Sequence, residues 1–172
     1  MKRYFDTVIL GLGLFFLAFS GYLLIERNTS RHLVYADTSP TKVVSPIRLT
    51  IKSIGLELPI IGAHIVDSKW DITKDGVSYL VTTPLPGSLG NSVMYGHNWS
   101  NLLGDLDRVK TGDTITVQNS DGVSHHYIVH FISVVTPDET HIYTNTPDYR
   151  LTLYTCTGFL DSKRLVVTAV KE

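Results

Sequence analysis

Hydrophobic and polar positions alternate in short runs through most of the chain after residue 45. β-branched and aromatic residues alternate with polar ones, and Gly, Pro, Asn and Asp separate the runs. A period of two predicts half-buried strands, and many short strands are typical of an all-β barrel or sandwich. Eight strands are predicted, at Ile47–Ile51, Leu56–Ile61, Val77–Leu80, Ser92–Gly96, Thr114–Gln118, Ser124–Val135, Leu151–Thr155 and Arg164–Val170.

The segments between these strands differ in character. Residues Asn101–Val109 space their leucines as a helix does, so one or two short helical turns are expected there. Residues Asn119–Gly122 predict a hairpin turn whose glycine takes a positive φ. The longest irregular connection, Thr136–Tyr149, leads into the strand that carries the cysteine. We interpret it as a wall of a binding site, with an ordinary surface connection as the alternative.

An uncharged apolar run lies near the N-terminus. Residues 7–25, TVILGLGLFFLAFSGYLLI, carry no charge and are bounded by Asp6 and Glu26. As a helix the run would be roughly 28 Å long, close to the hydrocarbon thickness of a bilayer. The apolar core of a cleaved signal peptide is usually only about 7–15 residues, so an uncleaved membrane anchor is favoured over cleavage.

The anchor divides the chain into four parts. We predict a cytoplasmic tail at 1–6, a transmembrane signal anchor at 7–25, an extracellular stalk at 26–45 and a folded domain at 46–172. The stalk is polar, rich in Ser and Thr, and without sustained periodicity. A short tail before the first helix favours a single-pass protein of the cell membrane, with the large domain outside and the lipid bilayer in contact with the anchor.

Composition excludes several classes of function. A formal net charge of −1 and a pI of about 6.6 give no basic surface for a nucleic acid, so no such partner is predicted. A single cysteine excludes an intramolecular disulfide and a Cys-rich zinc site. The acidic residues are scattered, and His126 and His130 lack a third ligand. We therefore expect no metal and no cofactor.

The single cysteine is the best candidate for chemistry. Cys156 ends the alternating run that begins at Thr152, and Arg164 starts the next predicted strand. A hairpin of the two strands would bring the guanidinium beside the sulfur, where it could donate hydrogen bonds to an oxyanion. A thiolate nucleophile also needs a nearby imidazolium or other cation. Among seven histidines, His97 follows a strand-like run that ends at Gly96, although a hydrogen-bonded turn histidine remains the alternative.

These residues together resemble the sortase family of bacterial membrane-anchored cysteine transpeptidases. The family's TLxTC motif is met at its four fixed positions by TLYTC, residues 152–156, and Arg164 follows it. Upstream, the stretch GNSVMYGHNWSNLLGDLDRVKTGDTI, residues 90–115, is also similar and aligns the family's histidine with His97. The resemblance covers nearly all of residues 46–172 and is nearer to class D, E or F types than to a particular protein.

The resemblance implies a fold and a reaction. It implies an eight-stranded β-barrel with Cys156 and Arg164 on neighbouring strands and His97 on a loop beside a third. Cys156 would attack the Thr–Gly bond of a surface protein's LPxTG-like C-terminal sorting signal and form a thioacyl intermediate. His97 would protonate the departing amine and later take a proton from the acceptor, while Arg164 stabilises the oxyanion. The acceptor would be an amine, on a cell-wall precursor or a pilin lysine.

The chain departs from better-known sortases in two places. Asn98 and Trp99 follow the histidine where many relatives have an arginine, and only seven residues separate Cys156 from Arg164. Two alternatives were weighed against a sortase. An L,D-transpeptidase would carry a Ser-His-Gly-Cys type signature, which is absent from the sequence. A membrane-anchored extracellular β-domain that binds a partner would require Cys156 to be buried and unreactive.

Overall fold

The structure is a computed structural model that describes residues 13, 15–23, 43–66 and 69–172. The predicted tail at 1–6, the predicted stalk up to residue 42 and much of the predicted anchor lie outside the described residues. Residues 13 and 15–23 are helical. Within the described ranges, no helix is both long enough and apolar enough to cross a bilayer.

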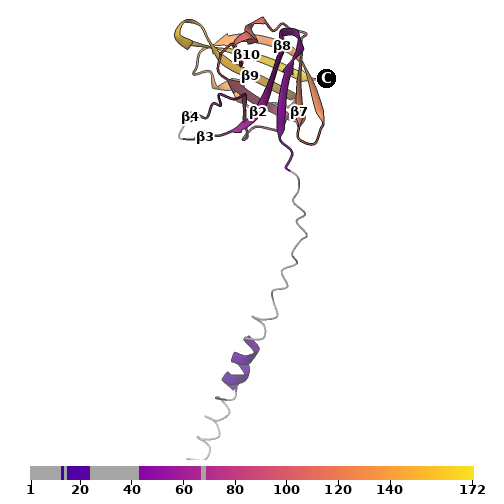
Figure 1. Cartoon of the computed structure of the whole chain (residues 1–172). Helices are drawn as coiled ribbons and strands as arrows, with labels where there is room; N and C mark the ends of the chain where they lie inside the picture. The colour runs from indigo at the N-terminus through magenta and orange to yellow at the C-terminus, as the bar shows by residue number, and fades with distance from the viewer. Residues whose placement is uncertain (1–12, 14, 24–42, 67–68) are drawn as a thin grey trace, which may run out of the picture. The chain divides into compact units, whose positions relative to one another are not determined.

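Eight strands close into a barrel in the order β1-β2-β5-β6-β9-β10-β8-β7 (Figure 1). Neighbouring strands are antiparallel except for the parallel pairs β2–β5 and β6–β9. The predicted all-β, eight-stranded barrel is therefore confirmed. The barrel strands are β1 (Pro46–Ile51), β2 (Leu56–Ala63), β5 (Val77–Leu80), β6 (Gly90–Gly96), β7 (Thr114–Asn119), β8 (Ser124–Val135), β9 (Tyr149–Thr157) and β10 (Lys163–Lys171).

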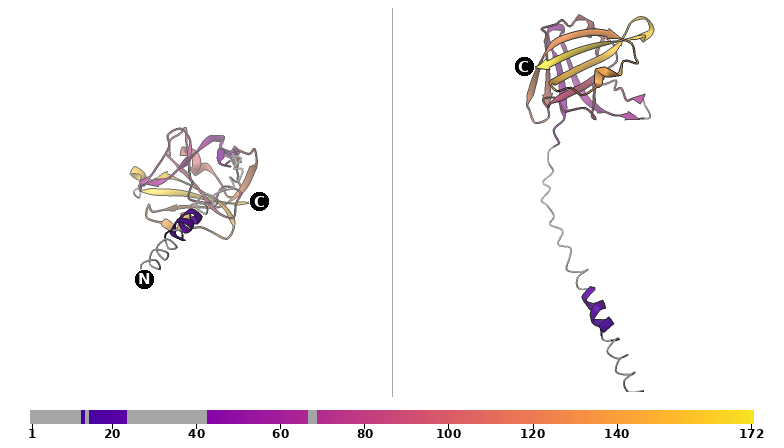
Figure 2. Two further views of the ribbon diagram at one scale, coloured as in Figure 1. Left: turned by 90° about the horizontal axis from the view of Figure 1, so that it is seen from below. Right: turned by 180° about the vertical axis from the view of Figure 1, so that it is seen from behind.

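Alternation along each strand separates the barrel interior from its outer face. On β9, Leu151 and Leu153 are fully buried, and their paired neighbours on β10, Ala169 and Val167, are buried in the same core. Side chains of a strand point alternately to its two faces. The residues between these inward positions therefore lie on the outside of the barrel. Figure 2 shows β9 and β10 side by side along their length in the view from behind.

Short elements connect the strands. Four 3-10 helices are described, η1 (Lys52–Ile54), η2 (Gly104–Arg108), η3 (Thr140–Tyr143) and η4 (Phe159–Asp161). The predicted helical turns at 101–109 are confirmed by η2, around which Leu102, Leu103 and Leu106 are buried. The predicted hairpin turn is also confirmed, because Gly122 has a φ of +89°.

One two-stranded sheet was not predicted. It pairs β3 (Ile65–Val66) with β4 (Lys69–Trp70) and is separate from the barrel sheet. Its Trp70 packs on the outer face of the barrel against Tyr95 of β6 and Tyr154 of β9, with ring centroids 4.6 and 5.8 Å apart. This packing creates a second, smaller hydrophobic cluster outside the barrel.

Candidate active site

Cys156 and Arg164 lie directly opposite each other in the antiparallel ladder of β9 and β10. Directly opposed residues of such a pair present their side chains on the same face. Because Leu153 and Thr155 of β9 and Leu165 of β10 point into the barrel, the thiol and the guanidinium both lie on its outer face. The predicted hairpin of these two strands is therefore confirmed.

His97 lies at the same end of the sheet, immediately after the last residue of β6. Gly96 pairs with Thr155 in the parallel ladder, and the Thr155 hydroxyl donates to the Gly96 carbonyl at 2.8 Å. His97 and Cys156 each follow one residue of this pair, so the backbone places them at the same level of the sheet, although His97 is not among the residues that line the cavity beside the thiol. The imidazole stacks on the Trp99 ring, with centroids 4.3 Å apart and planes inclined by 5°. Among the described residues no hydrogen bond joins His97 to Cys156.

The Arg164 guanidinium is held in place by three hydrogen bonds. Its Nε donates to the Tyr154 hydroxyl at 3.1 Å, and its Nη1 donates to the carbonyls of Asp161 at 2.7 Å and Lys163 at 2.9 Å. The guanidinium carbon also lies 6.0 Å from the centre of the Tyr154 ring. Within the described part of the chain, Nη2 has no partner. One terminal nitrogen is thus available to a group that approaches the thiol.

A cavity of about 260 Å³ opens beside the thiol. Aromatic and aliphatic side chains form most of its wall, to which Cys156 and Arg164 also contribute. Its lining residues are Trp70, Ile72, Tyr95, Gly96, Tyr154, Thr155, Cys156 and Arg164. Cys156 is partly exposed, which differs from the buried cysteine that a purely structural role would require.

Burial dominates the electrostatics of the site. It raises the pKa of the Cys156 thiol above its ordinary value; the Arg164 guanidinium opposes this rise, and the Asp161 carboxylate adds to it. Burial and, second, the Asp71 carboxylate raise the pKa of Tyr95 to about 12, and burial also raises the pKa of Tyr154. All three groups are therefore protonated at neutral pH in the absence of substrate.

The two residues that depart from the sortase pattern both organise this end of the barrel. The Trp99 ring stacks on the His97 ring, and the Asn98 amide donates to Asp161 Oδ1 at 2.9 Å. The second contact joins the histidine loop to the β9–β10 loop. That loop turns sharply, because Leu160 and Asp161 have positive φ angles of 50° and 59°.

The loop between β8 and β9, predicted to be a binding wall, is fixed to the barrel by buried Asn91. The Asn91 amide donates to the carbonyls of Ile142 and Thr144 at 3.0 and 3.2 Å and accepts from the Thr152 hydroxyl at 2.7 Å. Loop residues then line a second cavity on the outer face of the sheet, larger than the one beside the thiol.

Sequence reasoning missed several residues of the site. Tyr154 occupies the variable position of the TLYTC motif. Its place in the motif, two residues before Cys156, was the available indication that it lies near the thiol. Trp70 gave no such indication, because its contact with β6 and β9 depends on the fold. No group of three or more potential metal ligands occurs among the described residues.

Comparison with a protein-family model and comparison with solved structures give the same result. Residues 49–172 match the family model of the sortase domain. Sortase C-1 from Actinomyces oris is 35% identical, with a TM-score of 0.62 over 73% of this chain and 71% of that chain. A lid mutant of sortase A from Corynebacterium diphtheriae is 30% identical, with a TM-score of 0.64 over 74% and 69% of the two chains.

A third solved structure, sortase C from Clostridium perfringens SM101, is also 30% identical, with a TM-score of 0.61 over 74% of this chain and 70% of that chain. No curated protein sequence matches significantly. The family model covers more than half of the chain, and the solved structures share its fold. The chain therefore belongs to the sortase family of cysteine transpeptidases.

Proposed function

We propose that the protein cleaves an LPxTG-like sorting signal and transfers the acyl group to an amine. The observation that carries this proposal is the direct pairing of Cys156 with Arg164 in the wall of an outward-facing cavity. The apolar walls suit the side chains of a peptide, and the free Nη2 of Arg164 suits a developing oxyanion. The acceptor is proposed to be an amine of a cell-wall precursor or of a pilin lysine.

The proposed reaction has two steps. The Cys156 thiolate attacks the carbonyl carbon of the threonine, the Thr–Gly bond breaks, and His97 gives its proton to the departing glycine amine. The acceptor amine then attacks the thioester, gives a proton to neutral His97 and releases the thiolate. Arg164 donates hydrogen bonds to the oxyanion that forms in each step. Because the resting thiol is neutral, its proton passes to His97 before the first attack, and this is the proton that the departing amine takes. The proton that His97 takes from the acceptor amine returns to the thiolate after the second step.

We also propose that residues 7–25 anchor the protein in the cell membrane, with the barrel outside. The uncharged run and its length carry this proposal. Fractionation of cells followed by protease treatment of intact protoplasts tests it. Release of the full chain into the soluble fraction, or protection of the barrel from the protease, would remove the proposal.

The reaction is tested with the full chain, a panel of LPxTG-type peptides and an amine acceptor. Cys156→Ala is expected to abolish turnover, and His97→Ala to remain folded but lose it. Arg164→Lys is expected to lose roughly 10²–10³-fold in kcat, because a flexible ammonium does not replace the planar fork. Retained turnover in any of these variants would remove that residue from the mechanism. A panel on which wild type and Cys156→Ala are equally silent, with an unreactive thiol, favours the partner-binding alternative.

A further inference from the structure

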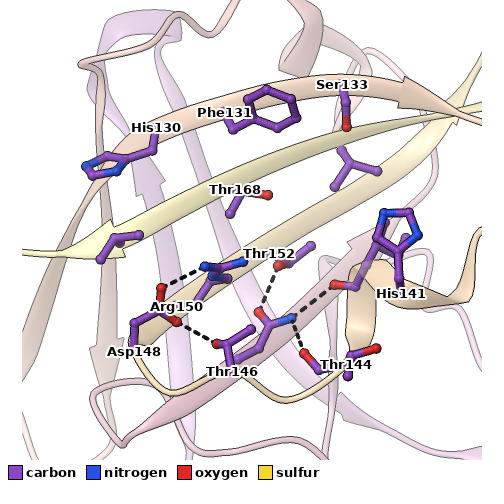
Figure 3. A pocket seen from close by; sticks show the side chains of 14 residues that line it. His130, Phe131, Ser133, His141, Thr144, Thr146, Asp148, Arg150, Thr152 and Thr168 are labelled. Carbon is purple, nitrogen blue, oxygen red and sulfur yellow. Dashed lines mark hydrogen bonds and ion pairs between the residues drawn. The ribbon is translucent and has the colours of Figure 1, made fainter.

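The larger cavity lies on the outer face of the sheet, under the β8–β9 loop. Its volume of about 380 Å³ is within the range of about 300–1,000 Å³ that is typical of small-molecule sites. Its floor is formed by outward residues of β9 and β10, among them the opposed pair Thr152 and Thr168. Figure 3 shows the β8 side chains along one edge of the cavity and the loop side chains along the opposite edge.

A β-bulge directs two neighbouring side chains toward this cavity. In the β8–β10 ladder Val129 pairs with Ala169 and Phe131 pairs with Thr168, so His130 is the extra residue. Such a bulge lets successive residues face the same side of a strand. His130 and Phe131 accordingly both line the cavity, and Phe131 is 64% exposed. The sheet thereby presents a largely exposed aromatic side chain at the edge of a polar cavity.

The charges in the cavity balance. Arg150 Nη2 donates to Asp148 Oδ2 at 2.7 Å, and the Thr146 hydroxyl donates to Oδ1 of the same carboxylate. The hydrogen bond from Arg150 has the largest effect on the pKa of Asp148 and holds it below its ordinary value. Burial, which is second, raises this pKa, and the hydrogen bond from the Thr146 hydroxyl lowers it. The pair therefore stays ionised and has no net charge. Because the pair as a whole carries no net charge, it offers no electrostatic gain to a ligand of either sign, so the site favours a neutral ligand.

One donor of this pair is not satisfied. Arg150 Nε is buried and has no hydrogen-bond partner among the described residues. A buried donor without a partner is destabilising, and few such groups occur in native proteins. This nitrogen has no accessible surface, but the Arg150 side chain as a whole is 34% exposed and lines the cavity, so its terminal nitrogens can donate to an acceptor oxygen of a ligand. Five of the fourteen lining residues also carry hydroxyls that can donate or accept, namely Ser133, Thr144, Thr146, Thr152 and Thr168.

We infer that this cavity binds a neutral saccharide of one or two rings. A sugar ring has several hydroxyls for the threonines and for Asp148, and an oxygen that can accept from the terminal nitrogens of Arg150. It also has an apolar face that can lie on the Phe131 ring. The inference does not depend on the proposed transpeptidation, because none of the lining residues belongs to the Cys156 cavity.

The test uses the full chain in a detergent without a sugar head group. N-acetylglucosamine, its β-1,4-linked dimer and maltose are titrated by calorimetry, with acetate and glucuronate as anionic probes. At least one neutral sugar is expected to bind with a dissociation constant on the order of 1 mM. In histidine-labelled protein, the ring signals of His130 and His141 should shift on binding, whereas those of His125 and His126 should not.

Two variants with matched controls locate the site. Arg150→Lys keeps a cation for Asp148 but removes the planar guanidinium with its second terminal donor, and should weaken binding at least about tenfold. Arg48→Lys, in the exposed Arg48–Glu57 pair of β1 and β2, should not change it. Phe131→Ala should likewise weaken binding, and Phe159→Ala, which removes an exposed ring outside the cavity, should not.

Cys156→Ala should bind the sugar with the same affinity as wild type. A variant that has lost transpeptidation should therefore still give a positive result in this binding test. Three results would overturn the inference. They are the absence of saturable binding of every neutral sugar at tens of millimolar, preferred binding of the anionic probes, and binding that neither Arg150→Lys nor Phe131→Ala weakens.

Discussion

The hydrogen bond from Arg164 Nε to the Tyr154 hydroxyl gives the sharpest prediction. Tyr154→Phe removes this bond and keeps the ring, which remains packed against Trp70 at a centroid distance of 5.8 Å. Hydrogen bonds to charged groups contribute about 1.5–3 kcal/mol. Because both Nη1 bonds of Arg164 persist, we expect the lower end of that range. The result is a kcat/KM roughly tenfold lower, since about 1.4 kcal/mol corresponds to a factor of ten.

The assay is the initial rate of peptide cleavage by the full chain. Tyr143→Phe is the matched control, because Tyr143 packs against the same Trp70 at 5.5 Å and its hydroxyl has no hydrogen bond among the described residues. In an Arg164→Lys background the Tyr154→Phe effect should largely disappear, because the two residues act through one contact. The reasoning is refuted if Tyr154→Phe and Tyr143→Phe differ by less than about twofold, the usual additivity error.

Two further predictions concern the thiol and a loop. Asp161→Asn should lower the raised pKa of Cys156, because it removes a carboxylate that raises this pKa, and the new amide oxygen can still accept the hydrogen bond from Asn98. The rate of alkylation by iodoacetamide should then reach half its plateau at a lower pH than in wild type. An unchanged midpoint would count against the charge effect. Gly90→Ala should destabilise the full chain in urea by ~1–3 kcal/mol more than Gly122→Ala. Both glycines have positive φ angles, but of the two only at Gly90 would a Cβ meet another side chain, Asn145, whose Oδ1 would lie 2.3 Å away. Equal unfolding midpoints for the two glycine variants would contradict the steric argument.

The barrel strands could be predicted because their inward residues repeat with a period of two. The ranges Val77–Leu80 and Ser124–Val135 were predicted with the bounds that the structure has, and the other strands differ by one or two residues at one or both ends. β3 and β4 could not be predicted, because strands of two residues are too short to show alternation. The bulge at His130 also escaped prediction, since it depends on the register with β10.

The candidate site could be predicted only in part. The placement of Cys156 opposite Arg164 followed from two adjacent strands joined by a short loop, which is local information. Tyr154, Trp70 and the Asn98–Asp161 contact lie around these residues only because distant segments meet on the outer face of the barrel. The class D, E or F resemblance and the catalytic roles remain predictions. The solved relatives compared above are named as sortases A and C.

The outward position of Cys156 separates substrate recognition from the stability of the protein. On β9 and β10, one set of alternate residues fills the barrel, and the other set, which includes Tyr154, Cys156 and Arg164, lies on its outer face. A molecule that binds in the cavity beside Cys156 reaches the thiol from the outer face without entering the barrel, so the barrel interior sets no limit on its size. Substrate preference can therefore change through outward residues such as Tyr154 while inward neighbours such as Leu153 keep the core unchanged.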